Sequence, residues 1–172
     1  MKSELASLMQ SAGYRVAWRD SHSKTDSTAA TLVVVQLQGA CSVPAGSSAS
    51  DGPAADTKTL ASTAVSDDVV LPFSIINCAA LSRVVWPSLA QEPGARRDFL
   101  YGRAMARLLA HELYHILANT RDHERDGIAK SHFTFTDLLT ERFEFEHTTL
   151  AKLQRAVPEV VTDTAADAPS GR

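Results

Sequence analysis

One short segment of the chain combines histidine and glutamate at a spacing that suits metal chemistry. It reads His111-Glu112-Leu113-Tyr114-His115. Residues four positions apart lie one above the other on the same face of a helix, so the two imidazoles can bind one Zn²⁺. The carboxylate of Glu112 can then reach a water molecule on that metal. The pattern predicts metal-assisted hydrolysis in which Glu112 is the general base and not a ligand.

The residues around this motif predict a long helix over 96–119, which has no proline and one glycine. Its apolar side chains cover most of its circumference, which is typical of a buried helix. Burying two histidines and a glutamate there is costly unless they have partners, and a metal would be such a partner. The alternative is that His111 and His115 are hydrogen-bonded core residues and that Glu112 is an exposed helix charge. The pair with Glu112 between them favours the metal.

A third ligand has to come from beyond this helix. Asn119 tolerates the left-handed conformation that ends many helices, and Thr120 favours a turn. A chain reversal there would return His123 to the two helical imidazoles. His111, His115 and His123 would then complete a tetrahedral zinc site with one open position. The competing third ligands are Asp122, Glu124 and Glu141.

The motif with His123 resembles the zinc site of the zincin metallopeptidases, nearest the metzincin branch, whose motif is H-E-x-x-H-x-x-G-x-x-H. The gap to the third histidine is two residues longer here, and Ala118 stands in place of the glycine. In the stretch Gly127-Ile128-Ala129-Lys130, Ala129 stands where the methionine of the family's turn is expected. The chain therefore resembles a divergent bacterial zincin-like group with H-E-x-x-H-x₇-H, over about residues 104–130.

This resemblance implies a zinc-dependent metalloendopeptidase that acts on a peptide or protein substrate. A further donor must stabilise the developing oxyanion, and His132 and Tyr101 are the candidates. One alternative is a zincin-like module that binds or assembles without catalysis. Another is a non-peptidase zinc hydrolase, because Asp122-His123 faintly resembles a feature of three-histidine bacterial ribonucleases. Glu112 at the general-base position and the pI of about 6.0 speak against RNA as the substrate.

The two cysteines, Cys41 and Cys78, each follow an apolar stretch, so they can lie at neighbouring strand ends. Two reduced, buried thiols are the alternative. The resemblance favours a disulfide, because extracytoplasmic metallopeptidases are common among such relatives and disulfides persist in oxidising compartments. A third reading makes Cys78 a metal ligand, as in peptide deformylases, but Ile76-Asn77-Cys78-Ala79-Ala80 does not match their E-G-C-L-S-like setting.

Length and charge limit the class of protein. A chain of 172 residues suggests one domain, over 1–160, with a flexible loop at about 40–58 and a disordered tail over 161–172. The net charge of −3 argues against nucleic-acid binding, and no apolar run is long enough to span a membrane. The N-terminus does not resemble a signal peptide, but a chain trimmed of its export signal would look the same. An extracytoplasmic or secreted protein is therefore expected, with a cytoplasmic one as the alternative.

The elements that must position the site predict an α/β (α+β) fold. A helical stripe runs from Leu5 to Ala12, and alternation from Tyr14 to Arg19 predicts a half-buried strand. The β-branched run Thr31–Leu37 suits a central strand. Residues 59–65 and 69–76 predict a hairpin with its turn at 66–68, and Pro72 indicates an edge or a bulge.

The remaining segments predict helices. Cys78–Trp86 is expected to form a short helix, followed by a connector over Pro87–Gly94. Apolar residues at helical spacing predict one long packing helix over Thr136–Ala156, ended by Pro158. The expected architecture is thus zincin-like, with a small twisted mixed sheet packed on the long active-site helix and a C-terminal helix.

Overall fold

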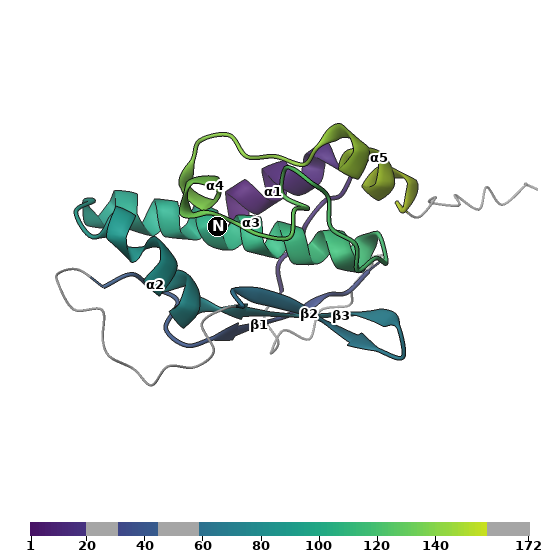
Figure 1. Cartoon of the computed structure of the whole chain (residues 1–172), viewed down its shortest axis with the longest axis horizontal. Coiled ribbons are helices and arrows are strands. Elements are labelled where there is room, and N and C mark those ends of the chain that lie inside the picture. The colour runs from purple at the N-terminus through teal and green to yellow at the C-terminus, as the bar shows by residue number, and fades with distance from the viewer. Residues whose placement is uncertain (20–30, 45–58, 158–172) are drawn as a thin grey trace, which may run out of the picture.

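A long helix, α3 (Gly94–Leu117), runs through the middle of the molecule. The computed structural model describes residues 1–19, 31–44 and 59–157. A small sheet lies on one side of α3, and helices α1 (Lys2–Ser11) and α4 (Phe135–Leu139) pack on the other side (Figure 1). The predicted tail and most of the predicted loop at 40–58 lie outside the described residues. Within the described part, no helix is long and apolar enough to cross a membrane.

The sheet is mixed, as the sequence predicted. It contains β1 (Val34–Gln38), β2 (Ala61–Ser66) and β3 (Val69–Asn77) in the order β1-β3-β2. Strand β3 pairs in parallel with β1 and antiparallel with β2. The chain is therefore a mixed α+β protein with β3 at the centre of the described sheet.

Two strand predictions were wrong. The segment 31–37 was expected to be central, but β1 begins at Val34 and lies at an edge, where Val34 is 50% exposed. A continuous β-branched run indicates a strand without showing how many neighbours it has. Residues 14–19 form no regular secondary structure although their side chains alternate. The hydroxyl of Tyr14 instead donates to the carbonyl of Leu153, at 3.0 Å, and ties this segment to the C-terminal region.

The hairpin of β2 and β3 confirms the prediction for residues 59–76. Asp67 and Asp68 form its two-residue turn with φ of 48° and 64°, the left-handed conformation that suits the twist of a tight hairpin. The pairing shifts between Thr63 and Val65, and β1 pairs with β3 only from Phe73 onward. Pro72 lies in this irregular part, where its missing N–H removes no regular ladder hydrogen bond, so the predicted bulge is confirmed.

Cys41 and Cys78 form a disulfide with their Cα atoms 4.8 Å apart. Because β1 and β3 are parallel, their carboxyl ends meet at one edge of the sheet, and each cysteine follows one of these strands. The predicted bridge is confirmed, and Cys78 is excluded as a metal ligand. Helix α2 (Cys78–Leu89) starts here, capped by the side chain of Asn77, and it includes Pro87, so the predicted connector starts later than expected.

The hydrophobic core lies around the middle of α3. Its residues from Ala104 to His115 are all buried. Helix α1 contributes Leu5, Leu8 and Met9, helix α2 contributes Leu81, Val85 and Leu89, and β3 contributes Val70 and Ile76. The histidine–glutamate motif therefore lies in the buried, C-terminal part of α3, a helix that packs against other elements on two sides.

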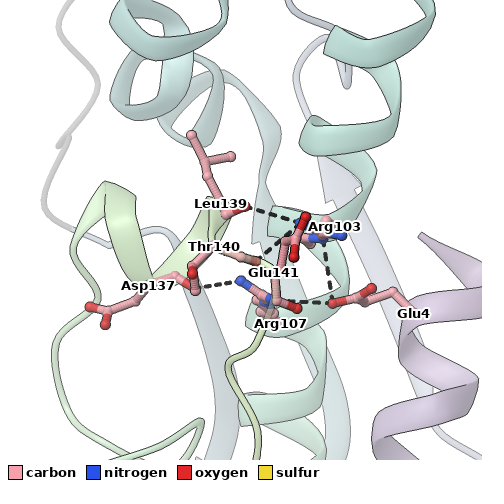
Figure 2. A network of polar contacts seen from close by, with 7 residues as sticks. All are labelled: Glu4, Arg103, Arg107, Asp137, Leu139, Thr140 and Glu141. Carbon is pink, nitrogen blue, oxygen red and sulfur yellow. Dashed lines mark hydrogen bonds and ion pairs between the residues drawn. The ribbon is translucent and has the colours of Figure 1, made fainter.

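The prediction of one long helix over 136–156 was wrong. The structure has two short helices, α4 and α5 (His147–Arg155), separated by an irregular segment. Two arginines of α3 explain the break, because their guanidinium groups bind the backbone carbonyls at the end of α4 (Figure 2). Arg103 donates to the backbone carbonyls of Leu139 and Thr140, both at 3.1 Å. The fully buried Arg107 donates to the backbone carbonyls of Asp137, at 2.7 Å, and Glu141, at 3.4 Å. Arg107 also donates to the carboxylate of Glu4, at 3.2 Å.

Candidate metal centre

The three histidines named from the sequence come together in the structure. His111 and His115 lie on the last two turns of α3, and His123 returns from the loop that follows. One nitrogen of each ring lies within 4.8 Å of the others. The helical pair are buried, whereas His123 is exposed, so the group opens toward solvent on one side. These three side chains can hold a metal ion.

The competing third ligands do not join this group. Glu124 accepts hydrogen bonds from the hydroxyl of Tyr114, at 3.5 Å, and from the ammonium of Lys152. Glu141 belongs to the segment bound by Arg107 on the other side of α3. Asp122 precedes His123 but is not one of the residues whose ligand atoms cluster.

The turn after α3 brings His123 back, as the sequence predicted. Asn119 has φ of 45°, in the left-handed region. The N–H of Thr120 donates to the carbonyl of His115, at 3.0 Å, and the N–H of Ala118 donates to that of Tyr114, also at 3.0 Å. These bonds satisfy carbonyls at the helix end and reverse the chain.

Backbone carbonyls fix the orientation of both helical imidazoles. The Nδ1 atom of His111 lies 2.7 Å from the carbonyl oxygen of Ile128, and Nδ1 of His115 lies 2.8 Å from that of Thr120. A carbonyl only accepts, so each Nδ1 carries the proton and each Nε2 presents a lone pair. The two Nε2 atoms are 3.1 Å apart. Two nitrogen lone pairs at this distance repel each other unless a cation or a proton lies between them. A metal ion bound to both nitrogens would remove this repulsion.

Burial also keeps these imidazoles in the form that binds metals. The pKa of His111 is lowered to about 4, chiefly by burial; the hydrogen bond to Ile128 opposes this shift, and the neighbouring His115 and His123 contribute to it. Burial likewise lowers the pKa of His115, while its bond to Thr120 opposes that shift. Both rings are therefore neutral at pH 7, and neutral imidazole is the ligand form.

The segment Gly127–Lys130, expected at the place of the family's methionine turn, contacts His111 through the carbonyl of Ile128. Ile128 and Ala129 are fully buried, and the N–H of Ile128 donates to the carbonyl of Glu144 at 3.1 Å. Gly127 has φ of 69°, and a Cβ there would lie 2.7 Å from the carbonyl oxygen of Glu144. Glycine is therefore required for the close approach that places the carbonyl of Ile128 against His111.

Glu112 is only 4% exposed, yet its side chain lines the same cavity as the histidines. The hydroxyl of Thr63, on β2, donates to its Oε2 atom at 2.6 Å. Burial raises the pKa of Glu112 to about 7, and the hydrogen bond from Thr63 opposes that shift. The carboxyl group can therefore exchange a proton near neutral pH.

A cleft of about 520 Å³ runs over the histidines and Glu112, between β2 and the loops after α3. His132 and Phe133 line it, and the Phe133 ring meets the His111 ring edge-on with centroids 5.3 Å apart. The Nδ1 atom of His132 lies 2.8 Å from the hydroxyl of Ser131. Arg121 also lines the cleft, and its guanidinium group pairs with the carboxylate of Asp68 in the hairpin turn, at 3.0 Å.

Tyr101 is not part of this cleft, so its prediction as an oxyanion donor was wrong. It lies nearly three turns before His111 on α3, and its hydroxyl donates to the carbonyl of Cys78 at 3.0 Å. Sequence reasoning also missed Thr63 and Phe133. Neither carries a local signal, because Thr63 reaches Glu112 only through the pairing of distant segments.

The site thus joins three converging imidazoles, a buried carboxylate of raised pKa and an open cleft. Comparison of the chain with protein-family models, with curated protein sequences and with solved structures found no match.

Proposed function

We propose that this protein is a zinc-dependent peptidase of the zincin-like type, with His111, His115 and His123 as zinc ligands and Glu112 as the general base. The observation that carries the proposal is the convergence of the three histidines, which line the same cleft as Glu112. The resemblance of the motif to zincin sites supports the same chemistry.

The donor set fits zinc. Zn–N bonds of about 2.0–2.1 Å at tetrahedral angles separate two ligand nitrogens by roughly 3.3 Å. The separation between the Nε2 atoms of His111 and His115 is 3.1 Å, close to that value. Three neutral nitrogen ligands also leave a fourth position open, as in catalytic zinc sites. When bound, zinc supplies a Lewis acid and lowers the pKa of a coordinated water from 15.7 to about 7.

The side chains of this chain supply the proton transfers. Glu112 takes a proton from the attacking water and later delivers it to the leaving amine. Its raised pKa suits both steps, because a group that titrates near the working pH can accept and release the same proton. His132, which lines the cleft, is the remaining candidate for stabilising the oxyanion.

An extended peptide suits the shape of the cleft. Strand β2 is an edge of the described sheet, and its residues from Ala61 to Thr63 line the cleft beside Glu112. A peptide can add to such an edge through backbone hydrogen bonds. The sequence predicted an edge or a bulge at Pro72, but the strand that contains Pro72, β3, is central in the described sheet. Strand β2 is therefore the edge strand to which a peptide would add in this proposal.

The disulfide supports an extracytoplasmic or secreted protein, because such bonds persist in oxidising compartments. The net charge of −3 supports a peptide substrate over a nucleic acid.

Metal content and peptide cleavage, measured on one preparation, test the proposal. We expect close to one zinc per chain and cleavage of a mixed peptide library. A chelator should abolish this cleavage and added zinc should restore it. Zinc without cleavage of any peptide would point to a non-peptidase hydrolase. A protein with no affinity for zinc would point to a binding module without catalysis.

A further inference from the structure

Two hydroxyl groups of the sheet form a chain of polar contacts that ends at the carboxylate of Glu112. Thr63 of β2 and Ser74 of β3 are directly opposite each other in the antiparallel pair. The Oγ1 atom of Thr63 lies 2.6 Å from Oε2 of Glu112 and 3.2 Å from Oγ of Ser74. Ser74 is fully buried and Glu112 nearly so, which makes each unmade hydrogen bond costly here. The sheet is thus linked to the general base by a short polar chain.

The direction of these hydrogen bonds follows from the groups involved. A threonine hydroxyl has one proton, and an ionised carboxylate only accepts. Thr63 therefore donates to Glu112, and Ser74 donates to Thr63. The reverse order would set a lone pair of Thr63 against the carboxylate at 2.6 Å. It would also leave the buried proton of Ser74 with no acceptor among the described residues.

This donor chain occupies one oxygen of the carboxylate and not the other. Among the described residues, the side chain of Glu112 has Thr63 as its hydrogen-bond partner, at Oε2. The same hydroxyl lies 3.3 Å from the backbone carbonyl of Glu112, so it is held close against α3. Threonine is also stiff at χ1 because it is branched at Cβ. Oε1 thus remains for the water while Oε2 is anchored.

We infer that Thr63 and Ser74 are positioning residues that hold the carboxylate of Glu112 for proton transfer. The inference rests on the proposed function, in which Glu112 is the general base. Thr63 acts directly on Glu112, and Ser74 acts through Thr63 by fixing its hydroxyl rotamer. Catalysis depends on such pre-set geometry, since a displacement of about 1 Å can cost about a hundredfold in rate.

Steady-state kinetics of zinc-loaded variants test the role of Thr63. Thr63→Val keeps the shape of the side chain and removes the hydroxyl. We expect unchanged zinc content, little change in KM and a kcat lower by roughly tenfold to a hundredfold. Thr63→Ser restores a hydroxyl and should recover most of the kcat. Ser74→Ala leaves the bond from Thr63 in place and should lower kcat less than Thr63→Val does. An unchanged kcat in Thr63→Val would overturn the inference.

A second buried threonine provides the matched control. Thr149 on α5 is fully buried, and its hydroxyl has no hydrogen-bond partner in the described structure. Thr149→Val makes the same chemical change away from the cleft, so kcat should stay at the wild-type value. An equal loss of kcat in both valine variants would show a general effect of buried threonine replacement and would contradict the role given to Thr63.

A double-mutant cycle in the chelated protein separates this inference from the proposed function. The free energy of unfolding is measured for Thr63→Val, for Glu112→Met and for the double variant. Contacting residues give non-additive effects, so we expect coupling for this pair and none between Thr149→Val and Glu112→Met. Additive effects for the Thr63 pair would refute the contact. If these two substitutions are coupled but the wild-type protein cleaves no peptide, the contact between Thr63 and Glu112 stands and the proposed peptidase function is refuted.

Discussion

At the residue scale, the candidate site is defined by which nitrogen atoms of the histidines carry protons. The carbonyls of Ile128 and Thr120 take the Nδ1 protons, and this leaves the Nε2 atoms of His111 and His115 facing each other. Such carbonyl partners orient metal ligands and are as much a part of a site as the ligands themselves. Both helical imidazoles therefore present Nε2 lone pairs that are oriented toward a position that a metal ion could occupy.

The third ligand can be tested by substitution. We expect His123→Ala to weaken zinc binding by at least about a hundredfold, because it removes one of three protein ligands. Asp122→Asn should bind zinc nearly as well as the wild type, since Asp122 lies outside the cluster. Competition with a coloured chelator measures both affinities. Wild-type affinity in the His123 variant would show that another side chain completes the site.

The shifted pKa values predict how acid affects the metal-free protein. Between pH 6.5 and about 4, unfolded His111 binds a proton that the folded form excludes, so the free energy of unfolding falls as pH falls. Between pH 7 and 4.5, folded Glu112 keeps a proton that the unfolded form releases, so the same free energy rises as pH falls. In the wild type these two effects offset each other over most of the range.

Glu112→Gln removes the second effect. On acidification from pH 6.5 to 4.5, the chelated variant should lose more stability than the chelated wild type, by up to about 1.4 kcal/mol per pH unit. Urea denaturation at several pH values measures the difference. Parallel pH profiles for the two proteins would be inconsistent with the environments described for His111 and Glu112.

At the element scale, helix α3 could be predicted from the sequence, whereas the strands around it could be predicted only in part. Helix α3 was predicted over 96–119 and spans Gly94–Leu117, so its apolar periodicity and Asn119, which are local signals, placed each end to within two residues. The break between α4 and α5 follows from Arg103 and Arg107, which bind the carbonyls of a segment 30 to 37 residues later in the chain. Periodicity cannot report such a contact, so it predicted one long helix.

The conformation of the loop that contacts His111 depends on Gly127. Gly127→Ala places a Cβ against the carbonyl of Glu144 in a left-handed conformation. We expect a loss of about 1–3 kcal/mol in the free energy of unfolding, together with weaker zinc binding through displacement of Ile128. Gly94→Ala is the matched control, because a Cβ there meets only the end of the Arg97 side chain, at 3.9 Å. Equal stability and zinc affinity in the two variants would contradict this role of Gly127.

At the scale of the whole molecule, the sequence predicted the mixed sheet, the disulfide and the helix that carries the motif. It could not predict that Thr63 would lie beside Glu112, because that contact requires the β2–β3 hairpin to pack against α3. Nor did it predict which strand lies at the edge of the cleft. Both depend on the order of strands in the sheet, which no local pattern fixes.

The disulfide connects the carboxyl ends of β1 and β3, and it closes a sequence separation of 37 residues. A bridge of this span typically stabilises a protein by about 2–4 kcal/mol. We expect almost no free thiol in denatured, non-reduced protein made under oxidising conditions. Reduction should lower the urea midpoint accordingly. Two reactive thiols in such material would contradict the bridge and remove its support for an extracytoplasmic protein.

The proposed mechanism requires Glu112 to be a base beside the metal and not a ligand of it. Glu112→Gln keeps the shape and the hydrogen bond to Thr63 but cannot take up the proton of the attacking water. The most direct test measures the zinc content and peptide hydrolysis of this variant against the wild type. We predict one zinc per chain, an unchanged fold and the loss of nearly all hydrolysis. Hydrolysis at the wild-type rate, or loss of the zinc, would contradict the proposed mechanism.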